Sequence, residues 1–72
     1  MYNIYSKDYQ KFIKLLRKAR EDAGFSQKYV ADKLGKPQSF VSKSESGERR
    51  VDFTELVKFA KILGQSLEYF AK

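Results

Sequence analysis

The chain contains no cysteine and no histidine among its 72 residues. Without cysteine it can form neither a disulfide framework nor a thiolate metal site. Without histidine it also lacks the commonest general base and metal ligand. No pair of carboxylates stands in an apolar setting that would tune one against the other for acid–base chemistry. The composition therefore predicts a protein that is not an enzyme and that carries no metal and no cofactor.

Long apolar segments are absent as well. No apolar run approaches the length that spans a bilayer, and the first residues lack the apolar core of a signal peptide. We therefore expect a cytoplasmic protein with no membrane partner. A chain of this length suits one small domain. We assign residues 1–72 to it, with residues 1–6 as a flexible or loosely packed N-terminus.

Acidic residues are in the minority, with 9 Asp and Glu against 15 Lys and Arg, which gives a net charge of +6. Such an excess suggests a polyanionic partner, and nucleic acid is the first candidate. The alternative, that the charge only keeps a small protein in solution, stays open. Residues 1–36 hold most of the excess (+5) and residues 37–72 little of it (+1). Charge alone therefore does not locate a binding surface.

Glycine and proline are few, and their places divide the chain into helices. Each glycine follows a helix-like segment, where a left-handed C-cap favours this residue: Gly24, Gly35, Gly47 and Gly64. Ser6, Ser26 and Asp52 are good N-caps for the segments that follow them. Glu55 stands three residues after Asp52 and completes a capping box. These signals predict where three of the helices begin.

Apolar residues recur at three- and four-residue steps inside these segments, as expected for one buried face of each helix. In the first helix they are Tyr9, Phe12, Ile13, Leu16, Ala19 and Ala23, and in the fourth Leu56, Phe59, Ala60 and Leu63. The second helix is expected to end near Leu34, the third to span roughly Gln38 to Glu45, and a short fifth turn to start at Ser66. No strand-like alternation is present. The sequence predicts an all-α fold of five helices.

Only three residues separate the second helix from the third, and so short a connection suits helices that cross at a steep angle. Ala31 is small where the next helix must pass closely, Gly35 supplies the backbone angle of the turn, and Val41 anchors the underside of the third helix. This spacing is typical of a DNA-binding helix-turn-helix, with its core at about residues 26–46.

The segment LLRKAREDAGFSQKYVADKLGKPQSFVSKSESGERR, followed by LVKFAKILGQSLEYF, resembles the lambda-repressor-like family, also called the XRE or Cro-type helix-turn-helix. The resemblance covers about four-fifths of the chain and implies a compact five-helix DNA-binding domain. It further implies a sequence-specific transcriptional regulator of double-stranded DNA. Such a regulator acts as a homodimer on a near-palindromic operator, as a repressor or through contact with RNA polymerase, and is nucleoid-associated when bound.

The outer side of the third helix carries the expected base contacts. Val41 faces inward on a helical wheel, so its polar neighbours point away from the core. Glutamine can bond an adenine edge bidentately, lysine can reach guanine acceptors, and serine can serve either base. By resemblance, the base-reading residues are Gln38, Ser39 and Lys43, with Ser42 beside them. The alternative for each is an ordinary solvated polar side chain.

Phosphate contacts are expected where helix N-termini offer free backbone amides. By resemblance, Gln27 is the family's phosphate-clamping glutamine at the start of the second helix. The other expected phosphate-binding residues are Ser26, Lys36, Ser46, Arg49 and Arg50. For the two arginines, surface ion pairs are the alternative. Glu48 departs from the family in sign, and repulsion there would cost affinity.

Two further residues are structural by resemblance. In the family, an arginine late in the first helix pairs with a glutamate that ends the third, and Arg20 and Glu45 occupy these positions. Ser44 departs from the pattern, because the family usually has a larger residue there. Packing at this point is expected to be loose unless Phe40 fills the gap. For Phe40, core packing is favoured over contact with a thymine methyl.

The dimer surface is expected to be formed by Leu67, Tyr69 and Phe70 together with the end of the fourth helix. The alternative is that these residues close the core. Two other functions stay open. One is the antitoxin of a toxin–antitoxin pair, for which no toxin-binding segment is visible. The other is a protein-interaction module that has kept the fold without DNA binding, against which the polar outer side of the third helix argues.

Overall fold

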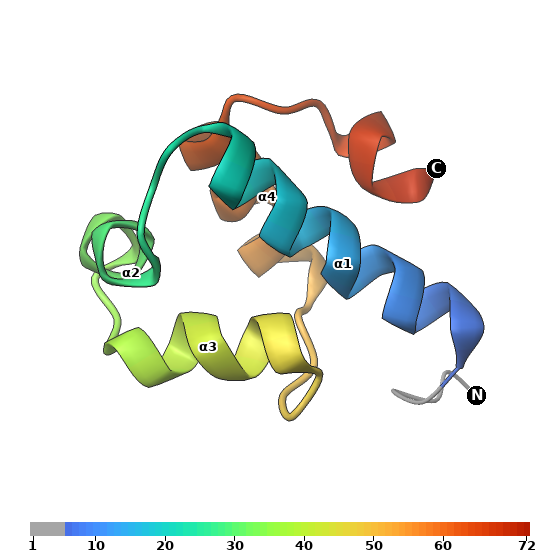
Figure 1. The fold of residues 1–72 in the computed structure, drawn as a ribbon, viewed down its shortest axis with the longest axis horizontal. Coiled ribbons are helices and arrows are strands. Elements are labelled where there is room, and N and C mark those ends of the chain that lie inside the picture. Colours follow the sequence, from blue (N-terminus) through green and yellow to red (C-terminus); the bar gives the residue numbers. More distant parts are fainter. Residues whose placement is uncertain (1–5) are drawn as a thin grey trace.

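The computed structural model describes residues 6–72, which form four α-helices and one short 3₁₀ helix (Figure 1). The elements are α1 (Lys7–Asp22), α2 (Gln27–Leu34), α3 (Gln38–Ser46), α4 (Phe53–Leu63) and the 3₁₀ helix η1 (Leu67–Ala71). Residues 6–72 contain no strand, so the all-α prediction is confirmed, whereas the count of five helices is wrong. In η1 the Tyr69 N–H bonds the carbonyl of Ser66, only three residues back, at 3.2 Å, which is the 3₁₀ pattern.

Each N-cap expected from the sequence is present. The side chains of Ser6 and Ser26 accept hydrogen bonds from backbone N–H groups three residues on, at 3.1 and 3.0 Å. Asp52 and Glu55 form the reciprocal capping box at the start of α4, with bonds of 2.8 and 3.1 Å. The expectation of a loose N-terminus otherwise falls on residues 1–5, which lie outside the described part of the chain.

Two glycines end the helices α2 and α3. Gly35 and Gly47 both have left-handed backbones, with φ of 71° and 87°. At the first, the Lys36 N–H bonds the Ala31 carbonyl at 2.9 Å and closes α2. At the second, a Cβ would approach the side chain of Ile13 to 3.2 Å. Glycine at 47 therefore provides both the turn and the close approach of α3 to α1.

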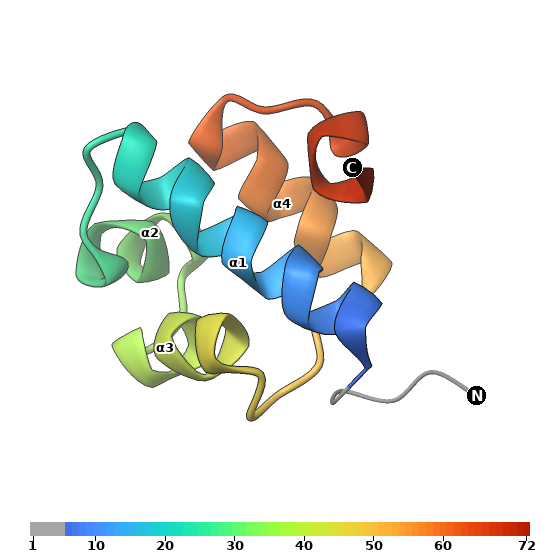
Figure 2. The same ribbon diagram turned by 45° about the vertical axis from the view of Figure 1, so that its right-hand side comes forward.

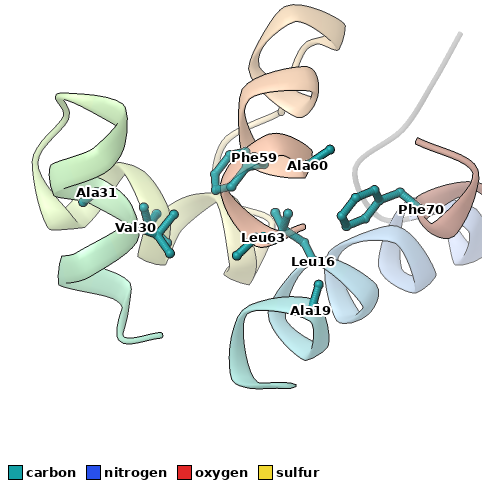
Figure 3. Packing of buried hydrophobic residues seen from close by; sticks show 9 residues of the cluster. Leu16, Ala19, Val30, Ala31, Phe59, Ala60, Leu63 and Phe70 are labelled. Carbon is teal, nitrogen blue, oxygen red and sulfur yellow. The ribbon is translucent and has the colours of Figure 1, made fainter. Parts of the chain in front are cut away.

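The core draws side chains from every element. Leu16, Val30, Val41, Phe59 and Phe70 come from α1, α2, α3, α4 and η1 and belong to one buried cluster. Figure 3 shows Leu16 and Phe59 between Val30 on one side and Phe70 on the other. The predicted inner faces of α1 and α4 are largely correct, but Ala23 is exposed because it is the C-cap of α1. No helix within residues 6–72 has the length and apolarity that a bilayer crossing requires.

Helix α3 lies along one edge of the domain, below α1 in both ribbon views (Figures 1 and 2). It packs against α2 and α1, whereas α2 also contacts α4. No other described helix covers its far side. The fold therefore supports one side of α3 and leaves the other open to a ligand.

Candidate nucleic-acid interface

The two sides of α3 differ in exposure. Val41 and Ser44 on the inner side are 0% exposed. Three of the four expected base-reading residues are exposed: Gln38, Ser39 and Lys43. Within residues 6–72, no hydrogen bond or ion pair engages these three side chains. Ser42 is half-buried, and its hydroxyl donates to the carbonyl of Ser39 at 3.3 Å. The outer side therefore offers an amide, a hydroxyl and an ammonium group to an approaching molecule.

Pro37 precedes this surface as the N-cap of α3. Its backbone is extended, with φ −65° and ψ 156°, and it makes no side-chain cap. The Phe40 N–H donates a hydrogen bond to the Pro37 carbonyl at 3.0 Å, and this bond closes the first turn of α3. The N-terminal end of α3, which carries Gln38, is thus unobstructed by any capping side chain.

Arg20 and Glu45 form a bidentate ion pair between α1 and α3. The guanidinium Nε donates to Oε2 at 2.6 Å and Nη2 donates to Oε1 at 3.1 Å. The remaining Nη1 donates to the carbonyl of Phe25 at 2.8 Å. The two charged side chains are only 11% and 4% exposed. The hydrogen bond with Glu45 raises the pKa of Arg20 above its ordinary value, so the guanidinium is charged at neutral pH. Because a buried charge without its partner is costly, this pair fixes α3 on its scaffold.

Gln27 and Ser26 lie at the start of α2. Gln27 is half-buried, and its Nε2 donates to Oε1 of Glu45 at 3.1 Å. Ser26 is exposed, but its hydroxyl oxygen already accepts from the Tyr29 N–H. The residue expected to clamp a phosphate is therefore attached to the same carboxylate that holds α3.

Arg49 belongs to a second ion pair. Of the two roles considered for this residue, phosphate binding and an ion pair, the structure shows the ion pair. Its Nη1 and Nη2 donate to the two carboxylate oxygens of Glu55 at 3.0 Å each. Its guanidinium also lies 4.1 Å above the ring of Phe40. The hydrogen bond to Glu55 raises the pKa of Arg49, and both partners are less than a third exposed. Arg49 thus ties the loop after α3 to the start of α4.

Ser44 explains why Arg49 can occupy this place. The hydroxyl donates to the Phe40 carbonyl at 2.7 Å and accepts from Arg49 Nη1 at 3.4 Å. The ring of Phe40 stacks on that of Phe59, with centroids 6.3 Å apart. The room left by the small serine is therefore filled by Phe40, as the sequence suggested, and by the arginine.

The other expected phosphate-binding residues are more exposed. Lys36 lies in the turn with its Nζ 5.5 Å from the ring centroid of Phe40. Arg50 is exposed, with its guanidinium 6.0 Å from the ring of Tyr9. The Ser46 hydroxyl donates to the Glu48 carboxylate at 3.0 Å. The Ser46 hydroxyl is therefore engaged by Glu48, the residue whose charge departs from the family pattern.

One contact that the sequence did not predict involves Tyr9. Its hydroxyl donates to the Arg49 carbonyl at 3.4 Å and accepts from the Val51 N–H at 3.0 Å. The loop after α3 is thereby tied to α1 as well as to α4. The sequence signal was a tyrosine on an otherwise apolar face, and its distant partners gave no local pattern.

The three residues expected at a dimer surface differ from one another. Phe70 is 6% exposed and packs in the core, so for this residue the core-closing alternative is correct. Leu67 is 40% exposed. Tyr69 is half-buried, and its hydroxyl has no hydrogen-bond partner within residues 6–72. Only Leu67 and the edge of Tyr69 remain accessible to a second copy.

Known proteins share this arrangement. The profile of a helix-turn-helix family matches residues 16–70. Two Bacillus subtilis proteins are similar: the SPbeta prophage-derived uncharacterized HTH-type transcriptional regulator YonR is 37% identical over 57 residues, and the uncharacterized HTH-type transcriptional regulator YqaE is 34% identical over 61. These alignments cover 79% and 85% of this chain but 53% of each relative, so the chain spans about half their length.

A solved structure, an XRE-family like protein from Pseudomonas syringae pv. tomato, superposes with a TM-score of 0.82 at 44% identity. The superposition covers 88% of this chain and 77% of that one. The chain belongs to the XRE-type, lambda-repressor-like family of helix-turn-helix proteins.

The Arg49–Glu55 pair predicts how stability depends on pH. Its hydrogen bonds lower the pKa of Glu55 below the ordinary value of 4.5. A lowered carboxyl pKa in the folded state adds stability above the unfolded pKa, and this stability is lost as pH falls through the folded value. Glu55→Gln should therefore cost about 1 kcal/mol at pH 7 and less near pH 3. Urea unfolding at both pH values measures this, and an equal cost at both would contradict the assignment.

Proposed function

We propose that the protein is a sequence-specific, double-stranded DNA-binding transcriptional regulator, a repressor that acts as a homodimer. The observation that carries this proposal is the division of α3 into a buried inner side and an exposed polar outer side. A helix of this kind fits the major groove, whose floor presents donors and acceptors. The names of the two Bacillus relatives, both HTH-type transcriptional regulators, support the same function. Its place of action is the cytoplasm, on the nucleoid.

Base reading is assigned to side chains between the first residue of α3 and its last turn. Gln38 stands at the first position of the helix and reads an adenine through its amide. Lys43 donates to guanine acceptors one turn further on, and Ser39 serves the base between them. Ser42 contributes less, because its hydroxyl is turned back to the helix carbonyl at Ser39.

Phosphates are held on both flanks of α3. On one flank, Gln27 and the free N–H groups at the start of α2 receive an anion, with Ser26 beside them. Lys36 and Arg50 supply positive charge near the two ends of α3, and Ser46, the last residue of α3, adds a hydroxyl. Arg49 supports this surface from behind through Glu55 and is not counted among the phosphate contacts.

One domain of this size contacts a half-site only, so two copies are required to read a near-palindromic operator. Their recognition helices would lie about 34–36 Å apart, one turn of the duplex. Leu67, exposed on η1, and the neighbouring edge of Tyr69 are the candidates for the contact between copies.

Replacing Gln38 tests the base-reading role. On a duplex selected from a random pool, Gln38→Ala should cost about 1–3 kcal/mol and relax the preference at one base pair. Affinity for random duplex should hardly change. Gln65→Ala, the same change in the connection between α4 and η1, is the matched control and should leave both affinities unaltered. Equal weakening on every sequence would remove Gln38 from the base-reading set.

Replacing Glu48 tests whether the end of α3 faces phosphate. Glu48→Gln removes a negative charge that would repel a phosphate and leaves an amide oxygen that can still accept from the Ser46 hydroxyl. Affinity for random duplex at low salt should rise about two- to tenfold, because the repulsion is electrostatic and weakly screened there. Glu68→Gln, the same charge change on exposed η1, should have much less effect. If the two variants bind alike, the gain reflects net charge and not position.

A further inference from the structure

The family resemblance predicts that Gln27 contacts a phosphate but does not say which group orients its side-chain amide. Gln27 is the first residue of α2, and its Nε2 donates to Oε1 of Glu45 on α3 at 3.1 Å. The two residues are 18 positions apart in the chain. A residue expected to contact DNA from α2 is therefore held by a side chain of the recognition helix.

The Glu45 carboxylate determines the orientation of the Gln27 side-chain amide. Glu45 is 4% exposed and its two oxygens are fixed by Arg20 at 2.6 and 3.1 Å. An ionised carboxylate only accepts hydrogen bonds, so the nitrogen end of the Gln27 amide must face it and the oxygen end cannot. An amide nitrogen carries two hydrogens. One is used by Glu45, and the second remains available beside the start of α2.

The backbone at the start of α2 offers further donors. The first N–H groups of a helix have no partner within it. In α2 the Ser26 hydroxyl oxygen accepts a hydrogen bond from the Tyr29 N–H, and the Ser26 carbonyl accepts one from the Val30 N–H. The N–H groups of Gln27 and Lys28, which precede these two in the helix, have no acceptor within α2. Together with the helix dipole, they favour an anion next to the Gln27 amide.

We propose that Glu45 is a positioning residue for the phosphate contact of Gln27: it holds the amide nitrogen through one of its two hydrogens, so that the second amide hydrogen and the first N–H groups of α2 bind one phosphate. This inference rests on the proposed DNA-binding function. It gives the Arg20–Glu45 pair a second role besides fixing α3. One carboxylate sets both the orientation of the base-reading helix and the orientation of the phosphate contact on its neighbour.

A double-mutant cycle tests this role. Gln27→Ala, Glu45→Gln and the double variant are compared with the unaltered protein on a random duplex of about 20 base pairs, long enough for two half-sites. Gln27→Ala should weaken binding about tenfold, the loss of one hydrogen bond to a charged group. The loss caused by Glu45→Gln should be at least about threefold larger with Gln27 present than with alanine there. Thermal unfolding, followed for each variant, ensures that binding is measured on folded protein.

The second ion pair supplies the matched control. Glu55→Gln makes the same charge change and also breaks a bidentate arginine pair, but Glu55 bonds Arg49 and the Asp52 N–H, not Gln27. A cycle of Glu55→Gln with Gln27→Ala should show no coupling, that is, a factor of about one. Equal coupling in the two cycles would show that Glu45 acts only through stability and would overturn the positioning role.

A measurement without any substitution completes the test. In the free protein, hydrogen exchange of the Gln27 side-chain amide, followed by NMR, should be slower than that of exposed Gln38. Equal rates would overturn the inference while leaving the proposed DNA-binding function intact. Additive effects in the Glu45 cycle on a protein that binds duplex would do the same. If the unaltered protein binds no duplex at all, both the function and the inference are wrong.

Discussion

The buried carboxylate of Glu45 is the interaction on which the geometry of the interface depends. It accepts hydrogen bonds from Arg20 on α1 and from Gln27 on α2, while Arg20 also bonds the chain just before α2. Three segments are thereby set at fixed distances around one end of α3. Such a pair adds little net stability compared with an apolar replacement, yet the loss of one partner leaves an uncompensated buried charge. Its value to this protein is orientation more than stability.

The loop after α3 is held by a different set of groups. Arg49 bonds Glu55 on α4, and the Tyr9 hydroxyl joins the same loop to α1. Together with the short turn at Gly35, these contacts restrain α3 at both ends and leave its middle to pack through Val41. Restraint of the α3 backbone matters for base recognition, because a helix that is already fixed in place loses less entropy when it binds.

Local signals in the sequence were sufficient for the fold. Caps and glycines act within three or four residues, so the bounds of α3 agree with expectation to within one residue. The hydrogen-bond pattern of η1 and the exposure of Ala23 were missed. The candidate site was less predictable. Arg49 finds Glu55 across a loop, and Gln27 finds Glu45 18 residues away, so neither pair leaves a periodic trace. The outward residues of α3 carry no periodicity of their own, and their expected roles come from the family resemblance.

The central claim is that the exposed side of α3 reads duplex DNA while its surroundings hold phosphates. The most direct test is the affinity of the protein for a selected duplex and for a random duplex across a salt series. We expect affinity to fall by orders of magnitude as salt rises, as for about six to ten phosphate contacts. The selected duplex should be preferred by at least roughly a thousandfold. A flat salt dependence with no preference between the two duplexes would contradict the claim.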